Sequence, residues 1–415
     1  MNPFEEKAKD INKTYKNWKS INVRPYDKET VYPYTRVRMI LMNGTEFEAI
    51  WNTARWSRHC ANNEVRRGMA LIRRGEQQQQ KRIACLKPRN ETILEHTIGY
   101  EQLAVDLTAI LAQREKNSYV KKQLDFALLE DFDHLYRYAD LLDFERGVHA
   151  EKLVGCYTEI MPGRPTVAEA RHPGDDVRFY INNFLNDPVT RLNIAIITAA
   201  EQQTMNYYLN VANLYDTELG RKLYSEIAMI EEQHVTGYGC LLDPTVDMFT
   251  CMVMHEYTEC YLYWSCMQDE TDARIREIWQ MHFEEELSHL KFATDMMEKY
   301  EGKVWQQIFP EGGAFPEPVK FAPQKGYVRE VLKSVRLTGH SESFADVNEL
   351  PDSYRFFGYN RSVQGNVRSL ASHTVIEKTI KKFGKDYRFE EKAHPIRELS
   401  GREEANADVA RIKGA

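Results

Sequence analysis

A spacing of acidic residues and histidines that recurs three times constrains this chain more than any other feature. One acidic residue is followed after 30 residues by a second acidic residue and after 33 residues by a histidine. The three sets are Glu101, Asp131 and His134; Glu201, Glu231 and His234; and Glu256, Glu286 and His289. Residues three apart share one face of a helix, so the second acid and the histidine can converge on one ion. The spacing therefore predicts three helical hairpins, each with about 15 residues out and about 15 back.

Hydrophobic periodicity supports these hairpins and makes the expected fold mainly α. The helices pair as 91–115 with 118–145, 186–214 with 217–236, and 244–268 with 271–300. The segments between these helices contain residues that commonly start or end a helix. Asn117 and Ser118 separate the first pair, and Gly237 ends the second. Asp243 and Pro244 form an N-cap and first-turn pair for the third.

The acidic residues of these sets stand on apolar helix faces. Around Glu201, for example, positions 194, 197, 205 and 208 are Ile, Ile, Met and Tyr. A carboxylate on such a face is costly unless it is paired or binds a metal. One Glu-x-x-His motif alone occurs often by chance on an acidic helix. Three motifs, each matched to an upstream acid at equal spacing, favour metal ligands.

Two further residues near these sets allow more than one interpretation. His282 lies one turn before Glu286 and is either a support for a ligand or a hydrogen-bonded core histidine. Glu259 shares a face with Glu256 and is either an extra ligand or the partner of a neighbouring cation. Several aromatic residues nearby are interpreted as core packing: Tyr207, Tyr208, Tyr261, Tyr263 and Trp264.

The sequence divides into three linear ranges. Residues 1–90 are expected to form a small mixed region, in which Asn43-Gly44 between two apolar runs predicts a short β-hairpin. A polar helix is predicted at 62–85. Residues 91–300 are expected to form the dimetal bundle, and 301–415 a C-terminal extension that ends in an exposed tail.

Composition excludes several classes of protein. A net charge of −7 gives no reason to expect nucleic-acid binding, and a solvated helix face explains the basic residues Arg66, Arg67, Arg73, Arg74, Lys81 and Arg82. No stretch is apolar enough for a membrane span or a secretory leader. The seven cysteines form no C-x-x-C pair, which argues against a zinc ribbon or a built-in rubredoxin centre. The expected setting is the reducing cytoplasm.

Which two hairpins form one site is left open by the sequence. The connection of some 40 residues between the first and second hairpins suits the crossover of a four-helix bundle and favours pairing those two. Ligand type favours the second with the third, because both carry Glu-x-x-His where the first has Asp131. The first with the third, or a larger cluster, is the remaining alternative. Glu201, Glu231 and His234 belong to both leading pairings.

The ligand order resembles that of the ferritin-like superfamily, and more closely its diiron oxygenase and ribonucleotide reductase small-subunit branch. The resemblance covers residues 91–300 and rests on Glu101, Asp131, His134, Glu201, Glu231 and His234. It departs from that branch in having Asp131 where glutamate is usual, and in its extra helical hairpin. What it implies is a ferritin-like bundle with two iron ions, or manganese in one or both places.

The resemblance also implies a function. The expected activity is that of a diiron oxygenase or oxidase, which activates O₂ to oxidise or oxygenate a small organic substrate. An external electron-donor protein and a homodimer are the expected partners, with no nucleic acid and no membrane. The alternatives are a rubrerythrin-like or manganese-catalase-like protein acting on peroxide or superoxide, and a non-catalytic metal-binding protein.

Overall fold

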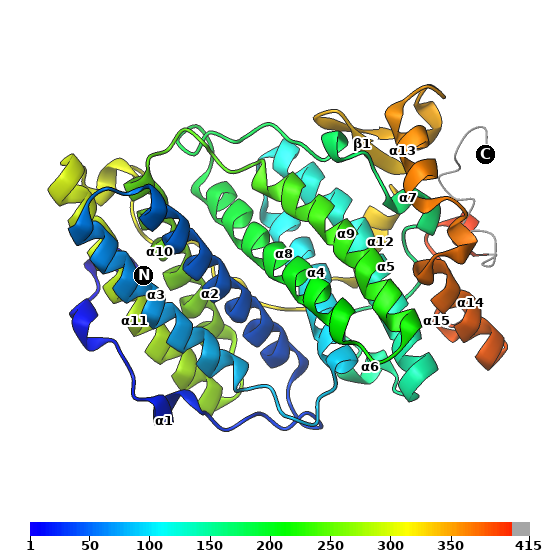
Figure 1. The fold of residues 1–415 in the computed structure, drawn as a ribbon, viewed down its shortest axis with the longest axis horizontal. Coiled ribbons are helices and arrows are strands. Elements are labelled where there is room, and N and C mark those ends of the chain that lie inside the picture. Colours follow the sequence, from blue (N-terminus) through cyan, green and yellow to red (C-terminus); the bar gives the residue numbers. More distant parts are fainter. Residues whose placement is uncertain (401–415) are drawn as a thin grey trace. The chain divides into compact units, whose positions relative to one another are not determined.

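The computed structural model describes residues 1–400, and these residues are mainly helical (Figure 1). Eight long helices carry the architecture: α2 (Pro33–His59), α3 (Asn63–Ala84), α4 (Ile93–Arg114), α5 (Ser118–Arg146), α8 (Pro188–Leu214), α9 (Glu218–Gly239), α10 (Met248–Asp269) and α11 (Ala273–Glu301). The shorter elements are α1 (Trp18–Ile21), α6 (Ala150–Leu153), α7 (Thr166–Glu169), α12 (Lys325–Leu332), α13 (Arg355–Gln364), α14 (Ala371–Phe383), α15 (Tyr387–Glu390), β1 (Leu337–His340) and β2 (Ser343–Asp346). The mainly α prediction is confirmed, and so are the six helices predicted between 91 and 300. The predicted cap Asp243–Pro244 is wrong, because α10 begins at Met248 and the side chain of Asp247 caps it. The end of the predicted tail, 401–415, lies outside the described residues.

The predicted β-hairpin around Asn43 and Gly44 is wrong. This segment lies inside α2, which Pro33 opens at its first turn. Gly44 is needed there for close packing, because a Cβ atom at this position would lie 2.9 Å from the Cβ of Gln203. An apolar run interrupted by Asn-Gly is typical of a hairpin, but burial of the surrounding helix outweighs the local turn preference. The polar helix predicted at 62–85 is confirmed as α3.

The chain forms two compact units, each assembled from segments that are separate in sequence. Unit 1 comprises 1–91, 181–203 and 243–321, and unit 2 comprises 92–180, 204–242 and 322–415 as far as they are described. The division cuts across the linear ranges 1–90, 91–300 and 301–415. One boundary falls within α8, after Gln203.

Unit 1 is built around a bundle of four helices. α2 packs against α3, α10 packs against α11, and the two hairpins meet through α10 with α2 and α11 with α3. Its core contains fully buried apolar side chains from all four helices, including Ile40, Ile72, Val253 and Trp279. The four helices therefore face one another across a shared interior.

Unit 2 is centred on α4, α5 and α9, with the last part of α8. α4 packs along α5, α9 packs on α5, and α14 covers both α5 and α9. Tyr208, on the unit 2 side of α8, contacts Tyr138 of α5 and Tyr224 of α9. The antiparallel pair β1–β2, with Leu337 opposite Asp346, lies outside this helical core.

The eight long helices are two copies of one four-helix pattern, displaced by 155 residues. Each boundary of α2, α3, α4 and α5 recurs 155 positions later as a boundary of α8, α9, α10 and α11. The end signals recur as well. Asn117 and Asp272 cap α5 and α11, and Gly147 and Gly302 end them with positive φ. Each unit combines helices from both copies: α2–α3 with α10–α11 in unit 1, and α4–α5 with α9 and the last part of α8 in unit 2.

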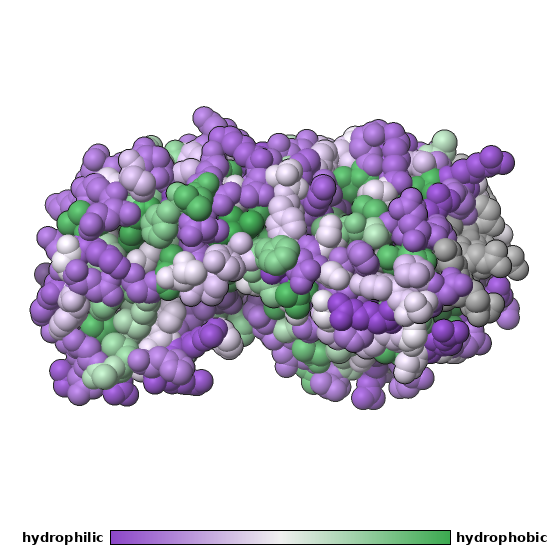
Figure 2. All heavy atoms as spheres, turned by 90° about the horizontal axis from the view of Figure 1, so that it is seen from above, coloured by the Kyte–Doolittle hydropathy of each residue, from purple (hydrophilic) through white to green (hydrophobic). Residues whose placement is uncertain are grey.

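The surface agrees with the polar composition. Hydrophilic side chains cover most of the face seen in Figure 2, and apolar side chains occur there in separate small groups. Within the described residues, every helix is too short or too polar to cross a membrane.

Candidate metal centres

In unit 2, two histidines on different helices point at the same buried carboxylate. His134 Nδ1 lies 3.0 Å from Glu231 Oε1, and His234 Nδ1 lies 3.3 Å from Glu231 Oε2. His234 Nδ1 is also 3.2 Å from Asp131 Oδ1. The two rings stack with centroids 6.1 Å apart, and all four side chains are at most 1% exposed. Two imidazoles and two carboxylates from α5 and α9 thus face one small interior space.

Glu101 of α4 completes this group from a third helix. One of its carboxylate oxygens lies within 4.8 Å of ligand atoms of His134 and Glu231. The hydroxyl of Tyr208 donates a hydrogen bond to Glu101 Oε1. The tyrosine orients this carboxylate and closes the group toward α8. We name Glu101, Asp131, His134, Glu231 and His234 the unit 2 cluster.

Glu201 lies on α8, two helical turns before Tyr208 and therefore on the same helix face. Its side chain is fully buried. Its position in the repeat is that of Glu46, which belongs to a carboxylate group in unit 1. Its role as a ligand remains a prediction.

Burial and the neighbouring imidazoles compete at two of the three carboxyl groups of the unit 2 cluster, and the resulting pKa shifts have opposite directions. Burial would raise the pKa of Glu231, but hydrogen bonds from His134 and His234 hold it well below its ordinary value. Burial raises the pKa of Asp131, although the charge of His234 opposes this. Glu231 is therefore more firmly ionised than Asp131, which suits a metal ligand.

His234 has a carboxylate behind it, on the side away from the cluster. Its Nε2 lies 2.9 Å from Glu130 Oε2. Burial would raise the pKa of Glu130, but the charge of Arg171 and the contact with His234 lower it to about 2, with Arg164 contributing. A carboxylate in this place fixes the orientation of a metal-binding imidazole. Sequence reasoning did not single out Glu130, because it is adjacent to the predicted ligand Asp131 and resembles any acidic neighbour.

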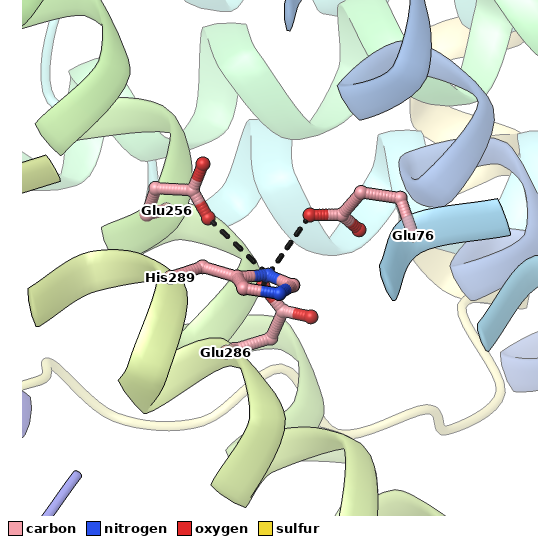
Figure 3. A group of neighbouring side chains, drawn as sticks. All are labelled: Glu76, Glu256, Glu286 and His289. Carbon is pink, nitrogen blue, oxygen red and sulfur yellow. Dashed lines mark hydrogen bonds and ion pairs between the residues drawn. The ribbon is translucent and has the colours of Figure 1, made fainter. Parts of the chain in front are cut away.

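Unit 1 holds a second group, drawn in Figure 3, that contains all three predicted residues of the 244–300 hairpin. His289 Nδ1 lies 3.1 Å from Glu286 Oε2, 3.8 Å from Glu256 Oε2 and 3.0 Å from Glu76 Oε1. Glu76 comes from α3, across the bundle from α10 and α11. All four side chains are fully buried.

Two more glutamates extend this group. Glu46 of α2, Glu76 of α3 and Glu259 of α10 have carboxylate oxygens within 4.8 Å of one another. The hydroxyl of Tyr263 donates a hydrogen bond to Glu46. We name Glu46, Glu76, Glu256, Glu259, Glu286 and His289 the unit 1 cluster.

Burial raises the pKa values of four carboxyl groups in the unit 1 cluster, and their mutual repulsion raises them further. These are Glu46, Glu76, Glu256 and Glu259. Burial alone would lower the pKa of His289, but the charges of Glu286 and Glu76 hold it well above its ordinary value. With only these side chains, the cluster has more negative groups than it can keep ionised.

Sequence reasoning missed Glu46, Glu76 and Gln79, although the signal was present. They have the same 30- and 33-residue spacing as the other three sets, with glutamine in the place of histidine. The predicted β-hairpin concealed the helix that carries Glu46, and Gln79 did not complete a Glu-x-x-His motif. His282 lies outside both clusters. Its Nδ1 contacts the Tyr263 hydroxyl, and its Nε2 contacts Arg82.

The four hairpins are thus distributed between two centres. The first predicted hairpin shares unit 2 with α9 of the second. The third shares unit 1 with α2 and α3, a partner that the sequence analysis did not consider. Of the nine predicted ligands, five lie in the unit 2 cluster, three lie in the unit 1 cluster, and Glu201 lies on α8.

Comparisons with known proteins add no relative. The chain gives no significant match to a protein-family model, a curated protein or a solved structure. Proposals about function therefore depend on the two clusters themselves.

Proposed function

We propose that unit 2 is a ferritin-like dinuclear metal centre that activates O₂ to oxidise an organic substrate. One observation carries the proposal: His134 and His234, from two helices, both direct Nδ1 at the carboxylate of Glu231. Each carboxylate oxygen of Glu231 thus has an imidazole nitrogen beside it, and these three residues would offer oxygen and nitrogen donors to a pair of metal ions. Paired Glu-x-x-His-type motifs facing each other across a helical bundle are the pattern of diiron and dimanganese carboxylate proteins.

The ligand set that we assign within unit 2 has three carboxylates and two imidazoles: Glu101, Asp131, His134, Glu231 and His234. Glu231, Glu101 and Asp131 would supply carboxylate oxygen from α9, α4 and α5. Glu130 holds the ring of His234 in place from behind, and Tyr208 does the same for Glu101. Because these residues are buried, bulk water is excluded from the centre.

The mixed nitrogen and oxygen donors suit iron, with manganese as the closest alternative. Bound there, a pair of ferrous ions supplies electrons for the reduction of O₂, which drives oxidation of the substrate. The chain has no C-x-x-C pair, and we expect a separate protein to return the electrons.

Anaerobic loading of the whole chain with Fe(II), followed by metal counting and exposure to O₂, tests this proposal. We expect two iron ions in unit 2 and O₂ consumption that depends on them. His234→Ala and Glu231→Gln should abolish both, since each removes a donor shared by the centre. His373→Ala is the matched control, because His373 is a buried histidine of unit 2 that contacts Glu377 outside the cluster.

Three outcomes would count against the proposal in different ways. If iron does not bind in unit 2, the metal centre itself is wrong. If iron binds and the protein disproportionates H₂O₂ rapidly, the peroxide-detoxifying alternative replaces O₂ activation. If iron binds without any turnover of O₂ or peroxide, a storage or structural role replaces both.

A further inference from the structure

We propose that the unit 1 cluster is a second, separate metal site. It binds a hard divalent cation, Mn²⁺ by preference, and most of its ligand atoms are carboxylate oxygens. It rests on side chains of α2, α3, α10 and α11 alone and does not require the proposed activity of unit 2. The 155-residue repeat allows the two clusters to be compared position by position.

That comparison shows one imidazole exchanged for oxygen donors. Gln79 occupies the position of His234, and Glu259 occupies the position of Ala104. Glu286 replaces Asp131 at a third position, which keeps a carboxylate there. The unit 2 cluster therefore has two histidines. The unit 1 cluster has only one histidine, but it has an additional carboxylate, Glu259, where unit 2 has Ala104.

The side chain of Gln79 offers an amide oxygen, but no nitrogen, in place of the histidine ligand. Its Nε2 donates a hydrogen bond to Glu286 Oε1 at 2.5 Å. An amide nitrogen that donates in this way has no lone pair for a metal. The exchange also removes the need for a carboxylate behind the ring. Glu285, at the position of Glu130, contacts Lys16 instead.

Two carboxylates of the unit 1 cluster have no hydrogen-bond donor within the described part of the chain. Both oxygens of Glu256 and both of Glu259 are buried and accept no hydrogen bond. The nearest groups are imidazoles, His289 at 3.8 Å and His255 at 3.6 Å.

No lysine or arginine among the described residues forms an ion pair with the five glutamates of the cluster. The closest basic side chains are engaged nearby: Arg82 lies against His282 and Glu285, and Lys16 pairs with Glu285. Burying several carboxylates without a counter-charge costs much more than the fold can supply. A divalent cation would provide that charge. Glu76 belongs both to the group with Glu256, Glu286 and His289 and to the group with Glu46 and Glu259, and in each group the ligand atoms lie within 4.8 Å of one another.

The donor set selects the class of cation. Carboxylate oxygen suits Mg²⁺, Ca²⁺ and Mn²⁺, whereas additional imidazole shifts preference toward iron and zinc. Five carboxylates with one imidazole place unit 1 nearer the first group than unit 2. His289 retains some affinity for transition metals, which points to Mn²⁺ within that group.

The test is anomalous diffraction from crystals of the whole chain grown with equal Mn²⁺ and Fe²⁺ under anaerobic conditions. Data at both absorption edges give the identity of the metal in each unit. We expect manganese in the unit 1 cluster and a higher iron share in unit 2. Absence of metal from unit 1, or the same Mn-to-Fe ratio in both units, would overturn the inference. Absence of metal from unit 2 alone would overturn the proposed function and leave this inference standing.

Matched variants sharpen the result. Gln79→His should raise the iron share of unit 1, and the reciprocal His234→Gln should lower that of unit 2. Glu259→Gln should weaken Mn²⁺ binding in unit 1 by at least about tenfold, since loss of even an outer partner costs about that much. Glu284→Gln is the control, because Glu284 is a half-exposed residue of α11 that pairs with Lys9. An unchanged metal ratio in Gln79→His would show that the imidazole exchange does not set the preference.

Discussion

At the residue scale, both clusters depend on where single ring nitrogens point. His134, His234 and His289 each turn Nδ1 toward carboxylates. The Nε2 side of the ring has different neighbours in His234 and in His289. Glu130 lies behind His234, whereas Gly75 lies against Nε2 of His289. These contacts decide whether an imidazole is held in position for a metal.

Substitution of Gly75 tests the packing behind His289. An added Cβ would lie 2.9 Å from His289 Nε2, closer than packed atoms allow. We expect Gly75→Ala to destabilise the protein by about 1–3 kcal/mol and to reduce metal occupancy in unit 1. Gly358→Ala, in α13 with open space around it, should be neutral or stabilise by up to about 1 kcal/mol through helix propensity. Urea denaturation and metal analysis measure both; equal effects of the two variants would contradict the packing argument.

Removal of the charge behind His234 tests the role of Glu130. Glu130→Gln should weaken metal binding in unit 2 by about 10–100-fold, because the imidazole loses its charged acceptor. Glu285→Gln is the matched control at the equivalent position, where no histidine is contacted. Isothermal titration with Mn²⁺, alongside circular dichroism to verify folding, separates a metal effect from a loss of structure. Unchanged affinity in a folded Glu130→Gln protein would refute the orienting role.

At the element scale, polar side chains attach loops and short elements to the helices. Asp175 is the clearest case in unit 2. Its carboxylate accepts hydrogen bonds from the Ser341 backbone at 2.9 Å, from Tyr354 at 2.5 Å, and from Arg355 at 2.6 and 3.0 Å. It thereby connects the loop before α8 to the β1–β2 turn and to the start of α13.

Asp175 should make this connection dependent on pH. Burial would raise its pKa, but the hydrogen bonds from Arg355, Tyr354 and Ser341 lower it below the ordinary value of 3.8. A carboxyl group with a lowered pKa stabilises the fold above the unfolded-state pKa, and this contribution is lost as pH falls through the folded-state pKa. Asp175→Asn should cost about 1–3 kcal/mol at pH 7 and progressively less below about pH 4. Urea denaturation at pH 7, 5 and 3.5 measures it; a constant difference would contradict the assignment.

At the scale of the whole molecule, the repeat explains why the chain crosses between its units. A four-helix pattern that occurs twice can pair its hairpins within a copy or between copies. Here each unit combines helices from both copies, so that α2 and α3 meet α10 and α11 far away in sequence. The result is two interiors of similar design whose donors have diverged.

Metal removal should reveal this arrangement in stability. A cation that binds only the folded state at about 100 times its Kd adds about 2.7 kcal/mol. We therefore expect chelation to lower Tm by several degrees and Mn²⁺ to restore it. The double variant Glu231→Gln/Glu259→Gln should lose most of this response, while each single variant keeps part of it. Calorimetry with and without chelator measures the shifts; a chelator effect that persists fully in the double variant would place the stabilising metal elsewhere.

Much of the helical framework could be predicted because its signals are local. Asn117, for example, marks the start of α5 through its own side chain. The ligands on Glu-x-x-His-type motifs could also be predicted, since residues three apart share a helix face whatever surrounds them. Glu46 and Gln79 were missed because one lay in a misassigned helix and the other lacked an imidazole. Glu130 was missed because only its contact with His234 distinguishes it from its acidic neighbours.

The sequence by itself determined that the chain is mainly helical and that buried acids and histidines recur at a fixed spacing, because periodicity and spacing act within one helix or one hairpin. Only the tertiary structure decided which hairpins share an interior, because that choice depends on packing between segments far apart in sequence. It separated one expected centre into two and placed α2 and α3 beside α10 and α11. The recurrent spacing thus belongs to four hairpins, and the difference between Gln79 and His234 distinguishes the two centres that they build.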